Sequence, residues 1–393
     1  MKLKAIPYKM INHIQNYEWG TKGKHAFIPN LLGYEGDETP TAELWIGGHP
    51  KLSSEVIINN AKIKIKDLIE TNAEELLGKF IVNKFGKQIP FLLKVLSANN
   101  ALSIQTHPNK KQAIKLHNID SKNYPDANHK PEIAIALDSL VALVGFRDFN
   151  KIEENLSKYY ELSEFIGFDV VDKFKSNKNT ENLRTLFSAL MNKSNQSIEL
   201  QKVILTLKTK IESNDNPSED ERLFDSLYNQ YGFDIGVLVL FFLNVVNLKV
   251  GEAIFTPAGI PHAYIKGNIV ECMANSDNVV RAGLTPKFKD VKQLIDILTY
   301  QAGDIELIGK KYSNKIYEYS VNVDEFLLQK VRLKNDTFQF VTNNSVEVLL
   351  VVEGELTCNN VKIKQGESLL LPALLNKISI EGSALFFRVG VPQ

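Results

Sequence analysis

The sequence predicts a mainly β protein that is interrupted by one helical block. Residues 1–150 contain short apolar or alternating runs, such as SSEVII, IPFLLKVL and PEIAIALDSLVALVGF, separated by Gly, Pro and Asn; this pattern is typical of strands. From 151 to 232 the apolar residues instead recur with the period of an amphipathic helix. From 233 onward the strand pattern returns and continues to the last residue. We therefore expect an order of β region, helical insert and β region.

The helical insert is predicted from two apolar stripes and one capping signal. The runs TENLRTLFSALMNK and SIELQKVILTLKTKI each place their apolar residues on one helical face. Ser218 and Glu221 stand at the spacing of a capping box, which predicts a third helix beginning there. The block contains no histidine. We expect it to be structural or to form a wall of the cleft.

The overall composition limits the classes of partner. Lys and Arg together number 46, as do Asp and Glu, so no net charge draws the chain to nucleic acid or to an anionic membrane. An anionic substrate must then be held by locally placed cations. The most apolar run, VLVLFFLNVVNL at 237–248, is too short to span a bilayer. Two cysteines exclude a disulfide framework, and the first residues lack the apolar core of a signal peptide. We expect a cytoplasmic protein.

An internal repeat occurs in the second β region. Residues 251–262 read GEAIFTPAGIPH and residues 366–377 read GESLLLPALLNK, with glycine and proline in the same places. Where the first copy has Gly259 and His262, the second has leucine and lysine. The spacing Gly-x5-Pro-x-Gly-x2-His resembles a motif of the cupin superfamily, whose members are antiparallel β-barrels that carry a metal inside. The resemblance implies a bicupin in which only the first copy keeps its histidine.

This resemblance divides the chain into three expected domains. Residues 1–150 together with 233–320 form a cupin domain that carries the metal site. Residues 151–232 form the α-helical domain inserted into it. Residues 321–393 form a C-terminal cupin-like β domain without metal ligands.

Three stretches offer candidate metal ligands. In SIQTHPNK, Gln105 and His107 share one face of a strand, so they are either two ligands or one polar face of a surface strand. Glu132 begins the alternating run EIAIA and faces the barrel interior, where a charge must be paired or bound to metal; the alternative is a salt bridge at the barrel mouth. His262 follows the rigid turn TPAGIP and is either a ligand or a hydrogen-bonded turn residue.

Taken together, the motifs resemble one family. SIQTHPNK, HKPEIAIAL, GEAIFTPAGIPHAY and VECMANSDNVVRAGLTPKF are similar, in order and spacing, to the type I mannose-6-phosphate isomerase family. The earlier stretches NYEWGTKG, PTAELWIGGHP and IPFLLKVLSANN agree with it. The resemblance covers nearly the whole chain. It implies one Zn²⁺ per chain, with the ligands Gln105, His107, Glu132 and His262, and it implies an active-site arginine at Arg281.

The implied reaction interconverts mannose 6-phosphate and fructose 6-phosphate through an enediol, with the metal stabilising negative charge on oxygen. A general base must then reach both C1 and C2 from one side. The residues alone do not rank its candidates, which are Glu271, Lys130, His129 and Asp277.

Other side chains are assigned to the substrate pocket. We expect Lys94 and Ser103 to bind the phosphate, although Lys94 could equally be structural. Tyr264 and Trp19 are expected to shape the pocket, or to pack in the core. His49, in GGHP, is interpreted as a turn residue.

Competing functions differ in their ligands. An epimerase or another metal-dependent sugar cupin would use a similar site. An iron dioxygenase favours two histidines and a carboxylate, which Gln105 argues against. A non-catalytic sugar-phosphate-binding cupin is a further alternative, but such proteins can lose the ligands that this chain keeps. We expect a monomer with a small sugar phosphate as its only partner, no nucleic acid and no membrane.

Overall fold

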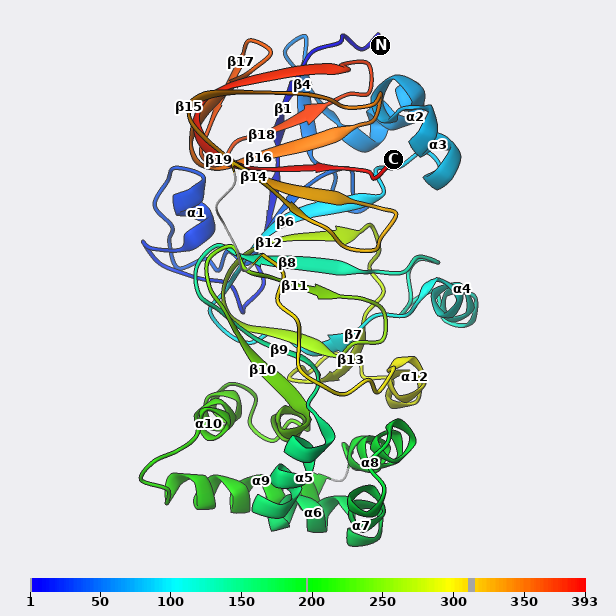
Figure 1. The fold of residues 1–393 in the computed structure, drawn as a ribbon, viewed down its shortest axis with the longest axis vertical. Coiled ribbons are helices and arrows are strands. Elements are labelled where there is room, and N and C mark those ends of the chain that lie inside the picture. The colour runs from blue at the N-terminus through cyan, green and yellow to red at the C-terminus, as the bar shows by residue number, and fades with distance from the viewer. Residues whose placement is uncertain (1, 196, 310–314) are drawn as a thin grey trace.

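The computed structural model describes residues 2–195, 197–309 and 315–393. Two sheets stack along the long axis of the molecule, and a block of helices closes one end (Figure 1). Both termini lie at the opposite end (Figure 1). Within these ranges, no helix is long and apolar enough to cross a bilayer.

The strands alternate with helices in the first half of the chain and dominate its last third. The strands are β1 Tyr8–Ile11, β2 His13–Gln15, β3 Glu43–Ile46, β4 Glu55–Ile58, β5 Ala61–Lys64, β6 Phe91–Ala98, β7 Ile104–Thr106, β8 Glu132–Ala136, β9 Leu140–Phe146, β10 Leu243–Leu248, β11 Ala253–Thr256, β12 His262–Ala274, β13 Val280–Gly283, β14 Ile316–Tyr319, β15 Leu327–Val341, β16 Glu347–Cys358, β17 Val361–Lys364, β18 Ser368–Leu371 and β19 Lys377–Gly390. The helices are α1 Phe27–Leu31, α2 Ile65–Leu77, α3 Lys79–Phe85, α4 Lys110–Ile119, α5 Phe149–Lys158, α6 Tyr160–Ile166, α7 Phe168–Ser176, α8 Thr180–Asn192, α9 Ser197–Glu212, α10 Glu219–Tyr231, α11 Gly236–Val239, the 3₁₀ helix η1 Leu240–Phe242 and α12 Val291–Ile297.

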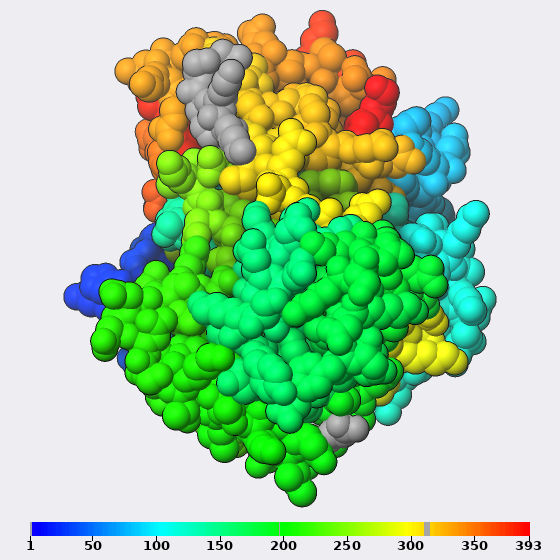
Figure 2. All heavy atoms as spheres, turned by 60° about the horizontal axis from the view of Figure 1, so that its bottom comes forward, coloured from blue at the N-terminus to red at the C-terminus, as the bar shows by residue number. Residues whose placement is uncertain are grey.

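The helical block is formed by α5 to α10. The apolar stripe of α8 is buried as predicted, and the capping box of α10 is present between Ser218 and Glu221. The block packs on β9, on η1 and on the start of β10 through one large apolar cluster. In Figure 2, where the lower end of the molecule comes forward, these helices cover the front of the view.

The ten-stranded sheet has the order β10-β9-β12-β6-β3-β2, with β8 and β7 also pairing with β12 and with β11 and β13 beside them. Alternation along its strands separates two faces. One face of β8, with Ala134 and Ala136, joins an apolar cluster that includes Leu96 and Tyr264; we call this the inner face. The other face, with Ile133 and Ile135, packs against the nine-stranded sheet.

Strand β12 connects the two halves of this sheet. Its first residues pair with β7 and β9, and residues 267–274 pair with β6 and β8. The change occurs at Gly267, whose φ is +133°, and a Cβ there would lie 2.4 Å from the carbonyl oxygen of Ser139. Only glycine therefore fits this close approach.

The nine-stranded sheet has the order β14-β15-β19-β16-β18-β1-β4-β5, with β17 beside β16. The first strand of the chain lies in this sheet, because Tyr8 pairs with Leu370. The predicted class, mainly β with a helical insert, is confirmed. The domain limits stay a prediction.

Candidate metal centre

The predicted ligands lie where three strands meet. His107 directly follows β7, while Glu132 and His262 are the first residues of β8 and β12. Strand β12 pairs with both β7 and β8, so these strand ends come together. In the register, His262 stands opposite Gln105.

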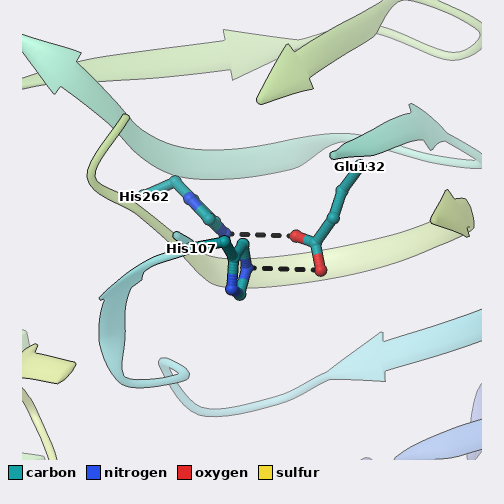
Figure 3. Close-up of side chains that lie close together, drawn as sticks. All are labelled: His107, Glu132 and His262. Atoms are coloured by element: carbon teal, nitrogen blue, oxygen red, sulfur yellow. Dashed lines mark ion pairs between the residues drawn. The ribbon is translucent and has the colours of Figure 1, made fainter. Parts of the chain in front are cut away.

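Three side chains converge in a buried cluster (Figure 3). The Nε2 atom of His107 lies 3.4 Å from Oε1 of Glu132, and the Nε2 atom of His262 lies 3.2 Å from Oε2 of Glu132. One ligand atom of each residue lies within 4.8 Å of the others. All three residues are at most 1% exposed. The geometry is that of a small cage with its polar atoms turned inward.

The protonation of the cluster suits a metal. His107 Nδ1 faces the carbonyl oxygen of Asn278 at 2.7 Å, and His262 Nδ1 faces that of Ile260 at 3.1 Å. Because a carbonyl only accepts, each Nδ1 carries a hydrogen, and in the neutral imidazole each Nε2 then keeps its lone pair. Both Nε2 atoms are buried without a hydrogen bond. Two neutral imidazoles and a carboxylate fit a zinc site.

The pKa shifts agree with this assignment. Burial, together with the nearby Lys130 ammonium, lowers the pKa of His107 to about 4. Burial alone would raise the pKa of Glu132, but Lys130 and His107 outweigh it and hold that pKa well below its usual range. The cluster thus holds a neutral imidazole beside an ionised carboxylate.

Arg281 lies on β13, where it pairs in register with Gln105 of β7, the strand that ends directly before His107. Burial lowers the pKa of its guanidinium, although this group stays charged. Among the described residues, no carboxylate lies within ion-pair distance of Arg281. A partly buried cation without an anion suits an anionic ligand.

A second polar group occupies the inner face beside the cluster. The Nζ atom of Lys94 lies 3.4 Å from a carboxylate oxygen of Glu43 and 3.4 Å from one of Glu271. Tyr264 donates a hydrogen bond of 3.1 Å to the other Glu271 oxygen. Burial alone would lower the pKa of Lys94, but the two carboxylates raise it above its usual value. The charge of Lys94 is thus already matched by protein groups, and its role with phosphate stays a prediction.

Two predicted proton carriers precede Glu132. The Nζ atom of Lys130 lies 2.5 Å from Oε1 of Glu132, so it contacts the metal cluster directly. His129 instead contacts Glu325, with its Nε2 atom 2.6 Å from Oε1. Sequence patterns did not indicate this pairing, because Glu325 lies almost 200 residues away.

Asp277 is held by His49 and Lys51 at a surface cavity. His49 Nε2 lies 3.4 Å from one oxygen and Lys51 Nζ lies 2.6 Å from the other. Burial alone would raise the pKa of Asp277, but His49 and Lys51 lower it below its usual range. All three line a cavity of about 320 Å³. As a turn residue, His49 accepts a hydrogen bond from the Lys51 N–H at its Nδ1 atom. The contact of His49 with Asp277 was not predicted from the sequence.

The remaining predicted residues surround this site. Ser103 is half-buried in the segment between β6 and β7. Trp19 packs against the apolar cluster of the inner face, which also contains Tyr264. The roles of these residues stay predictions.

Models of known families match three stretches of the chain and leave residues 244–314 outside them. The catalytic domain of phosphomannose isomerase type I matches residues 8–149, its helical insertion domain matches 156–243, and the cupin domain of mannose-6-phosphate isomerase matches 315–391. The mannose-6-phosphate isomerase of Schizosaccharomyces pombe is 38% identical over 378 residues, which cover 90% of each chain. The chain belongs to the type I phosphomannose isomerase family. The prediction from the sequence motifs is confirmed.

Other relatives of the phosphomannose isomerase family agree. The mannose-6-phosphate isomerase of Rattus norvegicus is 35% identical, over 95% of this chain and 96% of its own. A crystal structure of a zinc-bound mannose 6-phosphate isomerase superimposes with a TM-score of 0.88 at 32% identity, covering 98% of this chain and all of that one. The same values hold for the Salmonella typhimurium enzyme with fructose 6-phosphate and zinc.

Proposed function

We propose that this chain interconverts mannose 6-phosphate and fructose 6-phosphate with the help of one zinc ion. Family membership confirms the predicted enzyme class, an aldose–ketose isomerase. The observation that carries the metal requirement is the buried cage of His107, Glu132 and His262, whose imidazole Nε2 atoms make no hydrogen bond. Gln105, opposite His262 in the register, completes the ligand set.

The ion has one chemical role in this proposal. When bound, zinc supplies a Lewis acid that stabilises negative charge on the sugar oxygens. Arg281 adds a permanent positive charge from the neighbouring strand. Since no described carboxylate neutralises Arg281, its guanidinium is available to the substrate phosphate or to the enediolate.

The proton transfer between C1 and C2 needs a base whose pKa lies near the working pH. Burial and the charge of Glu132 raise the pKa of Glu271, which lies on the inner face. Asp277 has a pKa lowered by its contacts with His49 and Lys51, so it is a weak base. We therefore assign proton transfer to Glu271 and an orienting role to Asp277. Lys130, which contacts Glu132, remains the second candidate for a proton carrier.

The proposal also includes the oligomeric state of the enzyme and the direction in which it works. His107, Glu132 and His262 form a cluster without a second copy of the chain, which is compatible with a monomer; a cytoplasmic location stays a prediction from the sequence. An isomerase accelerates both directions equally. The same site therefore serves either the use of mannose or the supply of mannose 6-phosphate for GDP-mannose biosynthesis.

The test measures fructose 6-phosphate formed from mannose 6-phosphate in a coupled assay. Activity should vanish on chelation, return with zinc, and be lost in Gln105→Ala and His262→Ala. The control is His117→Ala, because His117 Nδ1 also faces a backbone carbonyl, that of Tyr124, but outside the metal cluster; it should keep full activity. A protein that binds zinc yet leaves mannose 6-phosphate unchanged would refute the function and favour a sugar epimerase.

The assignment of the base is tested by Glu271→Gln. We expect kcat to fall by about 10²–10⁴-fold, with a small change in KM, since the variant removes a proton carrier and keeps the shape of the side chain. Asp277→Asn should act mainly on KM. If the two variants show the opposite pattern, the roles of the two carboxylates are exchanged.

A further inference from the structure

Asn278 is a buried residue that touches the metal cluster only through its backbone. Its carbonyl oxygen lies 2.7 Å from Nδ1 of His107, and the residue is fully buried. This contact fixes the imidazole tautomer and the ring orientation, so that Nε2 points to Glu132. The position of one peptide group therefore decides how His107 presents its lone pair.

The side chain of Asn278 anchors this peptide group. Its Nδ2 atom donates to the carbonyl oxygen of Asp126 at 2.7 Å, to Oδ1 of Asp126 at 3.1 Å and to the carbonyl oxygen of Asn128 at 2.9 Å. The backbone N–H of Asn278 donates to Oγ of Ser276 at 3.2 Å. The side-chain amide of Asn278 is thus held by Asp126 and Asn128, which belong to a separate segment.

Asp126 completes the attachment from the other side. One carboxylate oxygen accepts from Ser276 Oγ at 2.8 Å, and the other accepts from the Asp277 N–H at 2.8 Å. Residues 276–278 are thereby fastened to residues 126–128. The first segment leads into β13 with Arg281, and the second leads to Glu132.

We propose that Asn278 is a positioning residue of the metal centre, which acts through His107 and is anchored by Asp126. The inference rests on the proposed metal site and goes beyond it, since Asn278 supplies no ligand atom. Neither the sequence pattern nor the set of inward-facing residues assigns it a role. Loss of the amide side chain frees the peptide group and lets the His107 ring turn, which lowers the affinity for metal.

The chain contains a matched control. Asn268, on β12, makes the same kind of contact with Asp138: its backbone N–H donates to Oδ1 at 2.9 Å, and its side-chain amide donates to Oδ2. It lies six residues from His262, which corresponds to about 20 Å along an extended strand. Asn268→Ala therefore removes an equivalent amide–carboxylate contact at a distance from the cluster.

The experiment compares zinc dissociation constants of the full-length protein, measured by competition with a chromophoric chelator. Asn278→Ala should bind zinc about 10–100-fold more weakly than wild type, as is typical when a group that orients a ligand is removed. Asn268→Ala should bind it as wild type does. Ser276→Ala, which removes only the hydroxyl contacts, should show a smaller loss and serves as the deciding variant if Asn278→Ala does not fold.

A spectroscopic readout separates positioning from general loosening. With Co²⁺ in place of zinc, the visible absorption bands should shift in Asn278→Ala and remain unchanged in Asn268→Ala, while the Tm of the metal-free protein falls in both. Wild-type affinity in Asn278→Ala and Ser276→Ala, or an equal loss in Asn278→Ala and Asn268→Ala, would overturn the inference alone. A wild-type protein that does not bind zinc would overturn the metal site as well.

Discussion

The two copies of the internal repeat share the conformation of their first glycine but differ at the turn that follows the proline. Gly251 and Gly366, at equivalent places, have φ angles of +79° and +81°. In the first copy, the N–H of Gly259 donates to the carbonyl oxygen of His107 at 2.9 Å, so the turn supports the metal cluster. In the second copy, the N–H of Leu374 instead donates into helix α2. The glycine turn that begins each copy is therefore a structural device, and the ligand histidine with its own turn is a separate feature of the first copy.

The interiors of the two regions differ in the same way. The inner face of the ten-stranded sheet carries Lys94, Glu132 and Glu271 beside its apolar residues. The nine-stranded sheet buries a cluster of leucines, isoleucines and phenylalanine, and its buried polar residues include Glu347 and Ser368. Among the described residues of this sheet, one ion pair is largely buried, between Glu347 and Arg388. Several charged side chains are thus buried at the inner face of the ten-stranded sheet, beside the proposed metal site.

Metal removal should produce the largest difference between the two sheets, because the proposed ligands belong to the strands of the ten-stranded sheet. Chelation should abolish activity and lower Tm. With free zinc at 1,000 times its dissociation constant, the stabilisation amounts to about 4 kcal/mol. Thermal unfolding with and without zinc measures it. His262→Ala should show no such shift; an equal zinc effect in that variant would place the metal elsewhere.

The nine-stranded sheet is tested by removing the cation of its Glu347–Arg388 ion pair. Arg388→Met should lower the free energy of unfolding by about 3–5 kcal/mol, because Glu347 is left buried without its cation. Zinc affinity and kcat should stay at their wild-type values, since the nine-stranded sheet holds no ligand. Urea unfolding and the coupled assay measure the two. A loss of activity in the folded variant would show that the two regions are coupled.

Equivalent turn positions give a smaller contrast. At Gly259, φ is +80° and a Cβ would lie 2.8 Å from the carbonyl oxygen of Ile297, so Gly259→Ala should cost about 1–3 kcal/mol. Leu374 is 42% exposed, so Leu374→Ala should stay within about 0.5 kcal/mol. Urea unfolding of both variants provides the measurement. Equal costs would mean that the turn is not more constrained in the first copy.

The sequence predicted the parts of this site that depend on local patterns. Alternation along the strand placed Glu132 on the same face as Ala134 and Ala136, and the rigid turn fixed His262. The apolar period located the helical insert. These features need only neighbouring residues, so one sequence contains their full signal.

Contacts between distant segments could not be predicted in this way. The pairing of Tyr8 with Leu370, and those of His129 and Asp277 with their partners, join segments far apart in the chain. The contact of His107 with the carbonyl oxygen of Asn278 uses a backbone atom that every residue possesses. Such a contact has no signature in side-chain type.

The pH dependence of stability should separate the two regions by its sign. Asp277, beside the ten-stranded sheet, has a pKa lowered by His49 and Lys51 against the effect of burial. Its contribution is present above its usual pKa of about 4 and is lost as pH falls towards the folded pKa. Burial raises the pKa of Glu347 in the nine-stranded sheet, despite Arg388. Its contribution is therefore present at low pH and is lost as pH rises through the folded pKa.

Urea unfolding of Asp277→Asn and Glu347→Gln, in chelator at pH 3.5, 5 and 6.5, measures both effects relative to wild type. The cost of Asp277→Asn should grow with pH, and the cost of Glu347→Gln should shrink, by about 1.4 kcal/mol for each pH unit by which a pKa is displaced. The metal ligands titrate equally in all three proteins, so they cancel in the differences. Slopes of the same sign would mean that Arg388 outweighs burial at Glu347 and lowers the pKa of its carboxyl.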